Sequence, residues 1–165
     1  MSKLIHLIYV SSFSIFLSSC TLKEEEAAVP STNLAEIEQI INLDLKGVRG
    51  KFEMLSLPES KGLPSPTDDM LIVAELDSDK LVTTKDNSIA PAELDIWLVP
   101  NANRAWLSES FRDFLKLYEN KKFPHDAPDC SIIATTFVVS RGEVLGYQCK
   151  RINKIFLYLH LPLQE

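Results

Sequence analysis

The densest group of reactive side chains in this chain lies between His125 and Cys130. The stretch His125-Asp126-Ala127-Pro128-Asp129-Cys130 brings an imidazole, two carboxylates and a thiol into six residues. Zinc binds these side-chain types, and the prolines would hold such a loop stiff. A proline-rich loop with aspartates at its turns produces the same stretch without a metal, however. We therefore treat His125, Asp126 and Asp129 as weak metal-ligand candidates, and we predict neither a metal site nor a cofactor.

The small number of histidines restricts hydrolytic chemistry. Outside the apolar N-terminal stretch the chain has His125 and His160, and His160 is expected in a strand, at an exposed face or rim. The H-E-x-x-H, G-x-S-x-G, phosphate-loop and G-x-G-x-x-G motifs do not occur. Asp77 and Asp79 resemble the start of a calcium loop, but the glycine and the distal glutamate of such a loop are missing. We predict no catalytic residue and no enzyme, and a small hydrolase built around His125 stays as an alternative.

The first residues have the pattern of a secretory signal. Lys3 supplies a positive charge, and residues 4–17 are dominated by Leu, Ile, Val, Phe and Tyr. This apolar stretch is shorter than the roughly 20 residues that a membrane-spanning helix needs. It ends in Leu17-Ser18-Ser19-Cys20.

That tetrapeptide resembles the lipobox of bacterial lipoproteins, in which a leucine and two small residues precede the lipidated cysteine. The resemblance implies that residues 1–19 are removed as a signal peptide and that lipid on Cys20 holds the chain to a membrane. An aspartate after the cysteine tends to retain such proteins in the inner membrane. Because Thr21 stands there, the resemblance implies the outer membrane, facing the periplasm. An ordinary signal peptide, with Cys20 incidental, is the alternative.

The segment behind Cys20 is expected to be a flexible tether over residues 20–30. Its charge run Lys23-Glu24-Glu25-Glu26 has nothing apolar to pack and is expected to be solvated. Removing Lys3 with the signal leaves 16 basic residues against 23 acidic ones, a net charge of −7. No nucleic-acid partner is expected for a chain with this charge and no basic stripe. Residues 31–165 have the length of a single domain.

Two further cysteines, Cys130 and Cys149, remain for that domain. In an oxidising periplasm such a pair suggests a disulfide, and two separate buried thiols are the alternative. The geometry raises a difficulty for the bond. If Ser140-Arg141-Gly142 forms a hairpin turn, Cys149 lies opposite Ile133 or Ala134 rather than Cys130.

Hydrophobic periodicity predicts an α+β domain with a small antiparallel sheet, about two helices and a C-terminal β-meander. Apolar residues at helical spacing predict helices over 34–43 and 104–121. The run 70–76 is apolar on both faces and is expected to be a central strand. Other strands are predicted over 51–57, 81–84, 93–99, 131–139, 143–151 and 155–161, with a loop over 58–69.

These features favour a non-enzymatic, membrane-anchored lipoprotein that binds another protein. An immunity protein against a periplasmic toxin, or an accessory subunit of an envelope secretion or assembly machine, would fit this description. An exposed Trp97 or Trp106 would mark the interface. The alternative is a lipoprotein that binds a small ligand or a lipid in a cavity between the sheet and the second helix.

Overall fold

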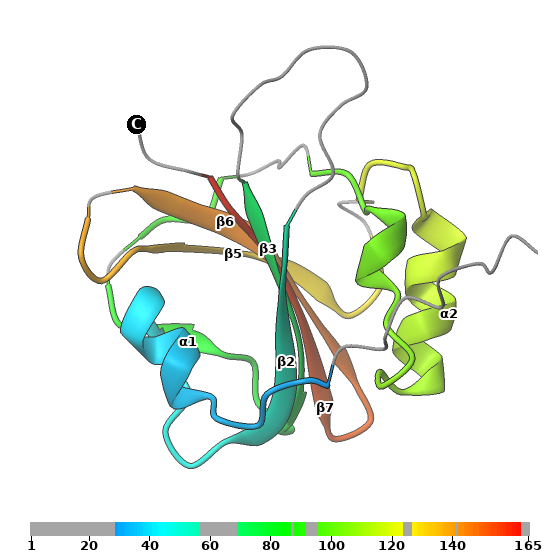
Figure 1. Ribbon diagram of the computed structural model, residues 1–165, viewed down its shortest axis with the longest axis horizontal. Helices are drawn as coiled ribbons and strands as arrows, with labels where there is room; N and C mark the ends of the chain where they lie inside the picture. Colours follow the sequence, from blue (N-terminus) through cyan, green and yellow to red (C-terminus); the bar gives the residue numbers. More distant parts are fainter. Residues whose placement is uncertain are drawn as a thin grey trace, which may run out of the picture.

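The computed structural model describes residues 29–56, 69–86, 88–91, 96–123, 127–140 and 142–162 (Figure 1). Helices and a mostly antiparallel strand system in these ranges form the predicted α+β fold. The signal peptide, Cys20 and all but the end of the tether lie outside the described residues and stay predictions, as does almost all of the 58–69 loop. The elements are α1 (Ala35–Ile40), β1 (Leu43–Asp44), β2 (Arg49–Ser56), β3 (Met70–Asp77), β4 (Thr83–Thr84), the 3-10 helix η1 (Pro100–Ala102), α2 (Glu109–Tyr118), β5 (Cys130–Thr136), β6 (Glu143–Arg151) and β7 (Lys154–Leu161).

Five strands form the main sheet in the order β2-β3-β7-β6-β5. Every neighbouring pair in it is antiparallel. Strands β5, β6 and β7 follow one another and form the predicted meander, after which β7 pairs with the much earlier β3. The last described strand is therefore the middle of the sheet, and β2 and β5 are its edges.

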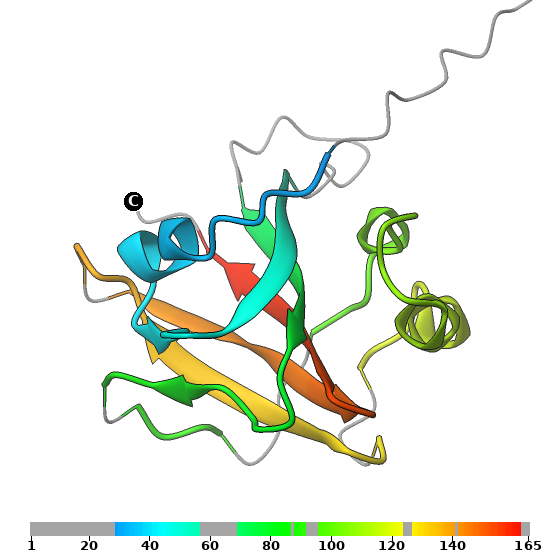
Figure 2. The same ribbon diagram turned by 90° about the horizontal axis from the view of Figure 1, so that it is seen from below.

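Each face of this sheet carries its own layer (Figure 2). α1 and the two-stranded β1–β4 sheet cover one face, and α2 with η1 covers the other. Successive strand residues point to opposite faces. In β3, Ile72 and Ala74 therefore pack in the α1 core, and Leu71 and Val73 pack in the α2 core. Burial on both sides explains the unbroken apolar run that predicted a central strand.

The β1–β4 layer is fastened to the edge strand β5 by Asp86. Its Oδ2 accepts hydrogen bonds from the Thr136 backbone N–H at 2.8 Å, from the Thr136 hydroxyl at 2.7 Å and from the Thr135 hydroxyl at 3.2 Å. Burial acts to raise the pKa of Asp86, but the hydrogen bonds from Thr136 and Ser88 outweigh it, so the pKa lies below its ordinary value. The carboxylate is held ionised at neutral pH.

Cys130 and Cys149 lie directly opposite each other in the β5–β6 hairpin and are joined by a disulfide. The predicted disulfide is therefore confirmed, but the expected turn is wrong. β5 ends at Thr136, and the connection to β6 begins at Phe137, whose backbone N–H donates to the Gly142 carbonyl at 3.1 Å. Cys149 therefore lies opposite Cys130 rather than Ile133 or Ala134, a change in register of three or four residues that brings the two sulfurs together.

A strand was predicted over residues 93–99, but residues 96–99, the part that the structure describes, do not form one. Trp97 makes one isolated bridge with Lys122, and the chain then enters η1. The buried Tyr158 hydroxyl holds this backbone instead, because it donates to the Trp97 carbonyl at 2.8 Å and accepts from the Val99 N–H at 3.1 Å. Burial raises the pKa of Tyr158 to about 12, so the hydroxyl keeps its proton and continues to donate.

Both helices are shorter than predicted. α1 has six residues, and Ile41 after it is extended and bridges Phe137. α2 buries Phe111, Phe114 and Leu115 on one side, as the periodicity indicates, but it starts only after Ser108. The residues before it are held out of the helix by contacts with the sheet, which form the site described next.

Candidate functional site

The predicted zinc candidates do not come together in the described part of the chain. His125 and Asp126 lie outside the described residues. Asp129 is exposed and pairs with Arg151 at 3.1 Å, and Cys130 is consumed by the disulfide. Across the described ranges no group of three or more His, Cys, Asp or Glu side chains could hold a metal ion.

His160 lies near one end of the sheet, where its ring is partly exposed as expected. Its Nε2 lies 3.3 Å from Asp69 Oδ2, just before β3 begins. The His–Asp contact joins two neighbouring strands, since Leu71 is the register partner of His160.

The two tryptophans have different roles. Trp97 is 55% exposed and remains a candidate interface residue. Trp106 is half-buried, and its indole N–H donates to Glu53 Oε2 at 2.9 Å. The Trp106 ring is therefore fixed against the sheet.

Glu53 on β2 anchors the segment that precedes α2. Arg104 binds it with two hydrogen bonds, Nη2 to Oε1 at 2.6 Å and Nε to Oε2 at 2.8 Å. The side chains of Arg104 and Glu53 are 19% and 10% exposed, so this is a largely desolvated bidentate pair. With Trp106 as the third donor, both carboxylate oxygens are occupied.

Glu75 on β3 makes the second anchor. Its Oε2 accepts the Ser108 backbone N–H at 2.6 Å, and its Oε1 pairs with Lys154. Ser108 is the N-cap residue of α2, and its side chain makes no cap. Glu75 accepts the Ser108 backbone N–H, which is the bond that the glutamate of a capping box makes from within a helix. The hydrogen bond from Glu75 raises the pKa of Lys154 above its ordinary value, against the lowering effect of burial.

Each oxygen of these two carboxylates accepts a hydrogen bond from a donor within the domain. Sequence reasoning missed both residues. A signal existed for Glu75, because a lone carboxylate inside the apolar run 70–76 requires a partner once it is buried. Glu53 gave no comparable signal, because it lies in a strand that also contains exposed polar residues.

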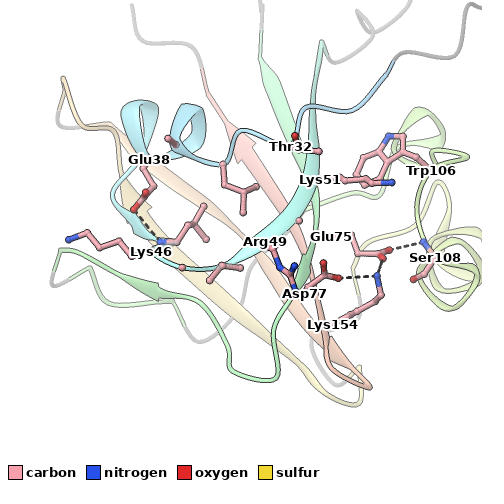
Figure 3. A pocket seen from close by; sticks show the side chains of 16 residues that line it. Thr32, Glu38, Lys46, Arg49, Lys51, Glu75, Asp77, Trp106, Ser108 and Lys154 are labelled. Atoms are coloured by element: carbon pink, nitrogen blue, oxygen red, sulfur yellow. Dashed lines mark hydrogen bonds and ion pairs between the residues drawn. The ribbon is translucent and has the colours of Figure 1, made fainter.

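A groove of about 840 Å³ lies beside these anchors and crosses the edge of β2 (Figure 3). One side is formed by the start of α1 and the β1–β2 turn. The other side is formed by Trp106, Ser108 and Lys154, with Gly50 between the two sides. The lining is Thr32, Leu34, Ala35, Glu38, Leu45, Lys46, Gly47, Val48, Arg49, Gly50, Lys51, Glu75, Asp77, Trp106, Ser108 and Lys154.

Comparison of the chain with protein-family models, with curated proteins and with solved structures finds no match in any of the three. In the ranges that the structure describes, none of the helices is long and apolar enough to cross a membrane.

The acidic residues of the groove have partners. Glu38 pairs with Lys85 at 2.6 Å, and the hydrogen bond from Lys85 is the main reason that its pKa is lowered, ahead of the raising effect of burial. Glu75 and Asp77 both pair with Lys154. The negative charge on the groove walls is therefore largely compensated by Lys85 and Lys154.

The remaining basic side chains of the groove lie near its acidic residues. Arg49 and Lys51 are the register partners of Asp77 and Glu75 on β3, and the charge of Lys46 helps to lower the pKa of Glu38. Lys46, Arg49 and Lys51 are exposed, and within the described residues none of their side chains makes a hydrogen bond or an ion pair. In Figure 3, Lys46 and Lys51 extend toward opposite ends of the groove, and Lys51 runs toward Trp106. The arrangement can attract anionic groups along the groove.

Proposed function

We propose that this chain is a lipid-anchored envelope protein whose folded domain binds another protein without catalysing a reaction. Lipid on Cys20 would fix the chain to the outer membrane, and the acidic tether would place the domain in the periplasm. The lipobox resemblance and the solvated tether support this placement, and a disulfide between Cys130 and Cys149 suits an oxidising compartment.

The observation that carries the binding proposal is the groove across the β2 edge. Its carboxylates form hydrogen bonds or ion pairs within the domain, whereas Lys46, Arg49 and Lys51 are exposed and make neither within the described residues. An arginine and a tryptophan on one surface are residue types enriched at protein interfaces, and exposed charges beside them can select a partner of opposite charge. An immunity protein and an accessory subunit of an envelope machine would both use such a surface in the same physical way.

The anchor is tested by feeding cells a fatty acid that carries an alkyne tag. The wild-type chain should incorporate the tag and fractionate with the outer membrane, and the Cys20→Ser variant should do neither. Incorporation of the tag into the Cys20→Ser chain would contradict the lipid assignment. A wild-type chain found in the inner-membrane fraction would contradict only the choice of membrane.

Protein binding is tested in intact cells with a photo-crosslinking amino acid. It is placed in the full chain at Lys51, at Trp97 or, as a control on the outer side of α2, at Lys116. A discrete protein adduct at Lys51 or Trp97, absent at Lys116, is expected. Adducts at none of these positions, or adducts with lipid alone, would reject the protein-binding proposal.

A further inference from the structure

We propose that the edge of β2 at Gly50 receives an extended acidic segment of the partner protein, with carboxylates at alternate positions of that segment. This inference rests on the proposed function and names the chemistry of the partner. Three observations support it. The backbone N–H and C=O of Gly50 face outward from the sheet, the cations beside Gly50 are spaced like the residues of an extended chain, and the chain as a whole is acidic.

The open backbone position lies next to a bridge that the domain makes with itself. Phe52 donates its N–H to the Ser31 carbonyl at 2.9 Å and accepts from the Ser31 N–H at 2.8 Å, so its backbone groups point away from β3. Backbone groups two residues apart in a strand point the same way, so those of Gly50 also face outward. After Ser31 the chain turns into α1, and within the described residues no hydrogen bond reaches the outward groups of Gly50. A partner backbone can continue the ladder there.

The cations beside Gly50 match the period of an extended chain. Arg49 and Lys51 are alternate residues of β2 and lie on the same face, roughly 6.6 Å apart along an extended strand. Alternate residues of a paired segment have the same separation, so two carboxylates of the partner can each meet one cation. Lys46 extends to the far end of the groove (Figure 3). Cations spread in this way favour an extended ligand over a compact anion such as phosphate.

The charge of the chain favours an acidic protein segment over an anionic lipid surface. The whole sequence carries a net charge of −6, and a flat anionic membrane would face that charge as well as the groove. A narrow segment reaches the three cations and avoids the acidic surface outside the groove. The carboxylates inside the groove are those of Glu38, Glu75 and Asp77, which pair with Lys85 and Lys154. The fixed Trp106 ring and the buried Leu34 and Leu45 side chains supply apolar walls on either side of it.

The proposal is tested with three octapeptides in a Thr/Val background. One carries three glutamates at alternate positions, one carries the same glutamates in a row, and one carries three glutamines. Binding to the full-length lipidated chain in neutral detergent is measured by fluorescence anisotropy. We expect the alternating peptide to bind at least about threefold more tightly than the contiguous one, and about tenfold more tightly than the glutamine peptide, since each exposed ion pair contributes modestly and three of them act together.

Matched variants assign the binding to the groove. The K46E/R49E/K51E chain should lose about tenfold or more in affinity, and the milder K46Q/R49Q/K51Q chain should lose less. A K80E/K116E/K150E control, with the same change in charge outside the groove lining, should keep its preference for alternate glutamates. An alternating peptide with N-methylated backbone amides should also bind more weakly, because it cannot donate to Gly50.

The outcomes separate this inference from the proposed function. If no acidic peptide binds, or if the three peptides bind alike, the inference is overturned. Competition by inorganic phosphate or by micelles containing anionic phospholipid, without any preference for alternate glutamates, would assign the groove to a small anion or a lipid and overturn it too. Protein adducts at Trp97 with none at Lys51 would leave the proposed function intact and remove this site. Loss of protein adducts at every position would remove both.

Discussion

The carboxylate of Glu75 and the backbone N–H of Ser108 are joined by a hydrogen bond of 2.6 Å. It ties the N-cap residue of α2 directly to β3. The same carboxylate pairs with Lys154 on β7, so one side chain links a helix and two neighbouring strands.

Replacing Glu75 by alanine should therefore destabilise the domain. The change leaves the Ser108 N–H without its acceptor and Lys154 without its nearest partner, and we expect a loss of about 2–3 kcal/mol in the free energy of unfolding. Urea denaturation followed by circular dichroism measures it. Asp77→Ala is the control, because Asp77 is 54% exposed and lies 3.4 Å from Lys154, and its loss should be below about 0.5 kcal/mol. Equal losses in the two variants would contradict the anchoring role of Glu75.

The pairing of Glu53 with Arg104 should show strong coupling. Glu53→Met or Arg104→Met alone leaves one largely buried charge unpaired and should cost about 2–4 kcal/mol, a range set below that of a fully buried pair because both side chains keep some exposure. The double variant should cost less than the sum of the single ones, since neither charge then remains. Trp106→Phe removes one donor to Glu53 and should cost about 1 kcal/mol. If the loss in the double variant equals the sum of the two single losses, the contact between Glu53 and Arg104 contributes nothing to stability.

Stability should fall in acid partly through Asp86. Its folded pKa lies below its ordinary value of 3.8, so its contribution is present above the unfolded pKa and is lost as the pH falls through the lowered folded pKa. Asp86→Asn should thus be less stable than wild type at pH 7, and the gap should close as the pH falls below about 4. Urea midpoints at several pH values measure this gap. A gap for Asp86→Asn that stays constant with pH would reject the mechanism.

The disulfide should stabilise the domain mainly through its effect on the unfolded chain. Cys130 and Cys149 are 19 residues apart, and closing a loop of this size contributes about 3 kcal/mol. The double variant C130S/C149S should lose roughly this amount, as should the wild-type chain after reduction. Urea midpoints with and without reductant measure both. If reductant also lowers the urea midpoint of the double variant, the loss of stability in the wild-type chain has a cause other than this bond.

Local patterns in the sequence predicted most of the elements, because burial on one or both faces leaves a periodic trace. The meander, the central run 70–76 and the apolar face of α2 are examples. The pattern failed at 93–99, where alternation of apolar residues was correct but the backbone partner was the Tyr158 hydroxyl rather than a strand. Nothing within a local window reveals a bond between residues about 60 positions apart.

The candidate site was harder to predict for the same reason. Glu53 meets Arg104 and Glu75 meets Ser108 only because β2 and β3 lie under the start of α2. The groove cations are scattered in sequence between an exposed turn and an edge strand, and their gathering along one groove becomes visible only when the rest of the fold is in place. Turn geometry likewise decided the pairing of Cys130 with Cys149, since a change in register of three or four residues separates bonded from unbonded cysteines.

The place of β7 at the centre of the sheet also constrains how the domain can assemble. The β2–β3 and β5–β6 pairs are local, but only β7 joins them, and its His160 meets Asp69 from 91 positions further along the sequence. Contacts of such long range carry a large loop-closure entropy and form late. Without residues 154–161 the β2–β3 and β5–β6 pairs have no strand between them, and each would expose apolar residues that β7 covers. Isolated strand pairs are marginally stable in water, so the sheet depends on all three parts being present together.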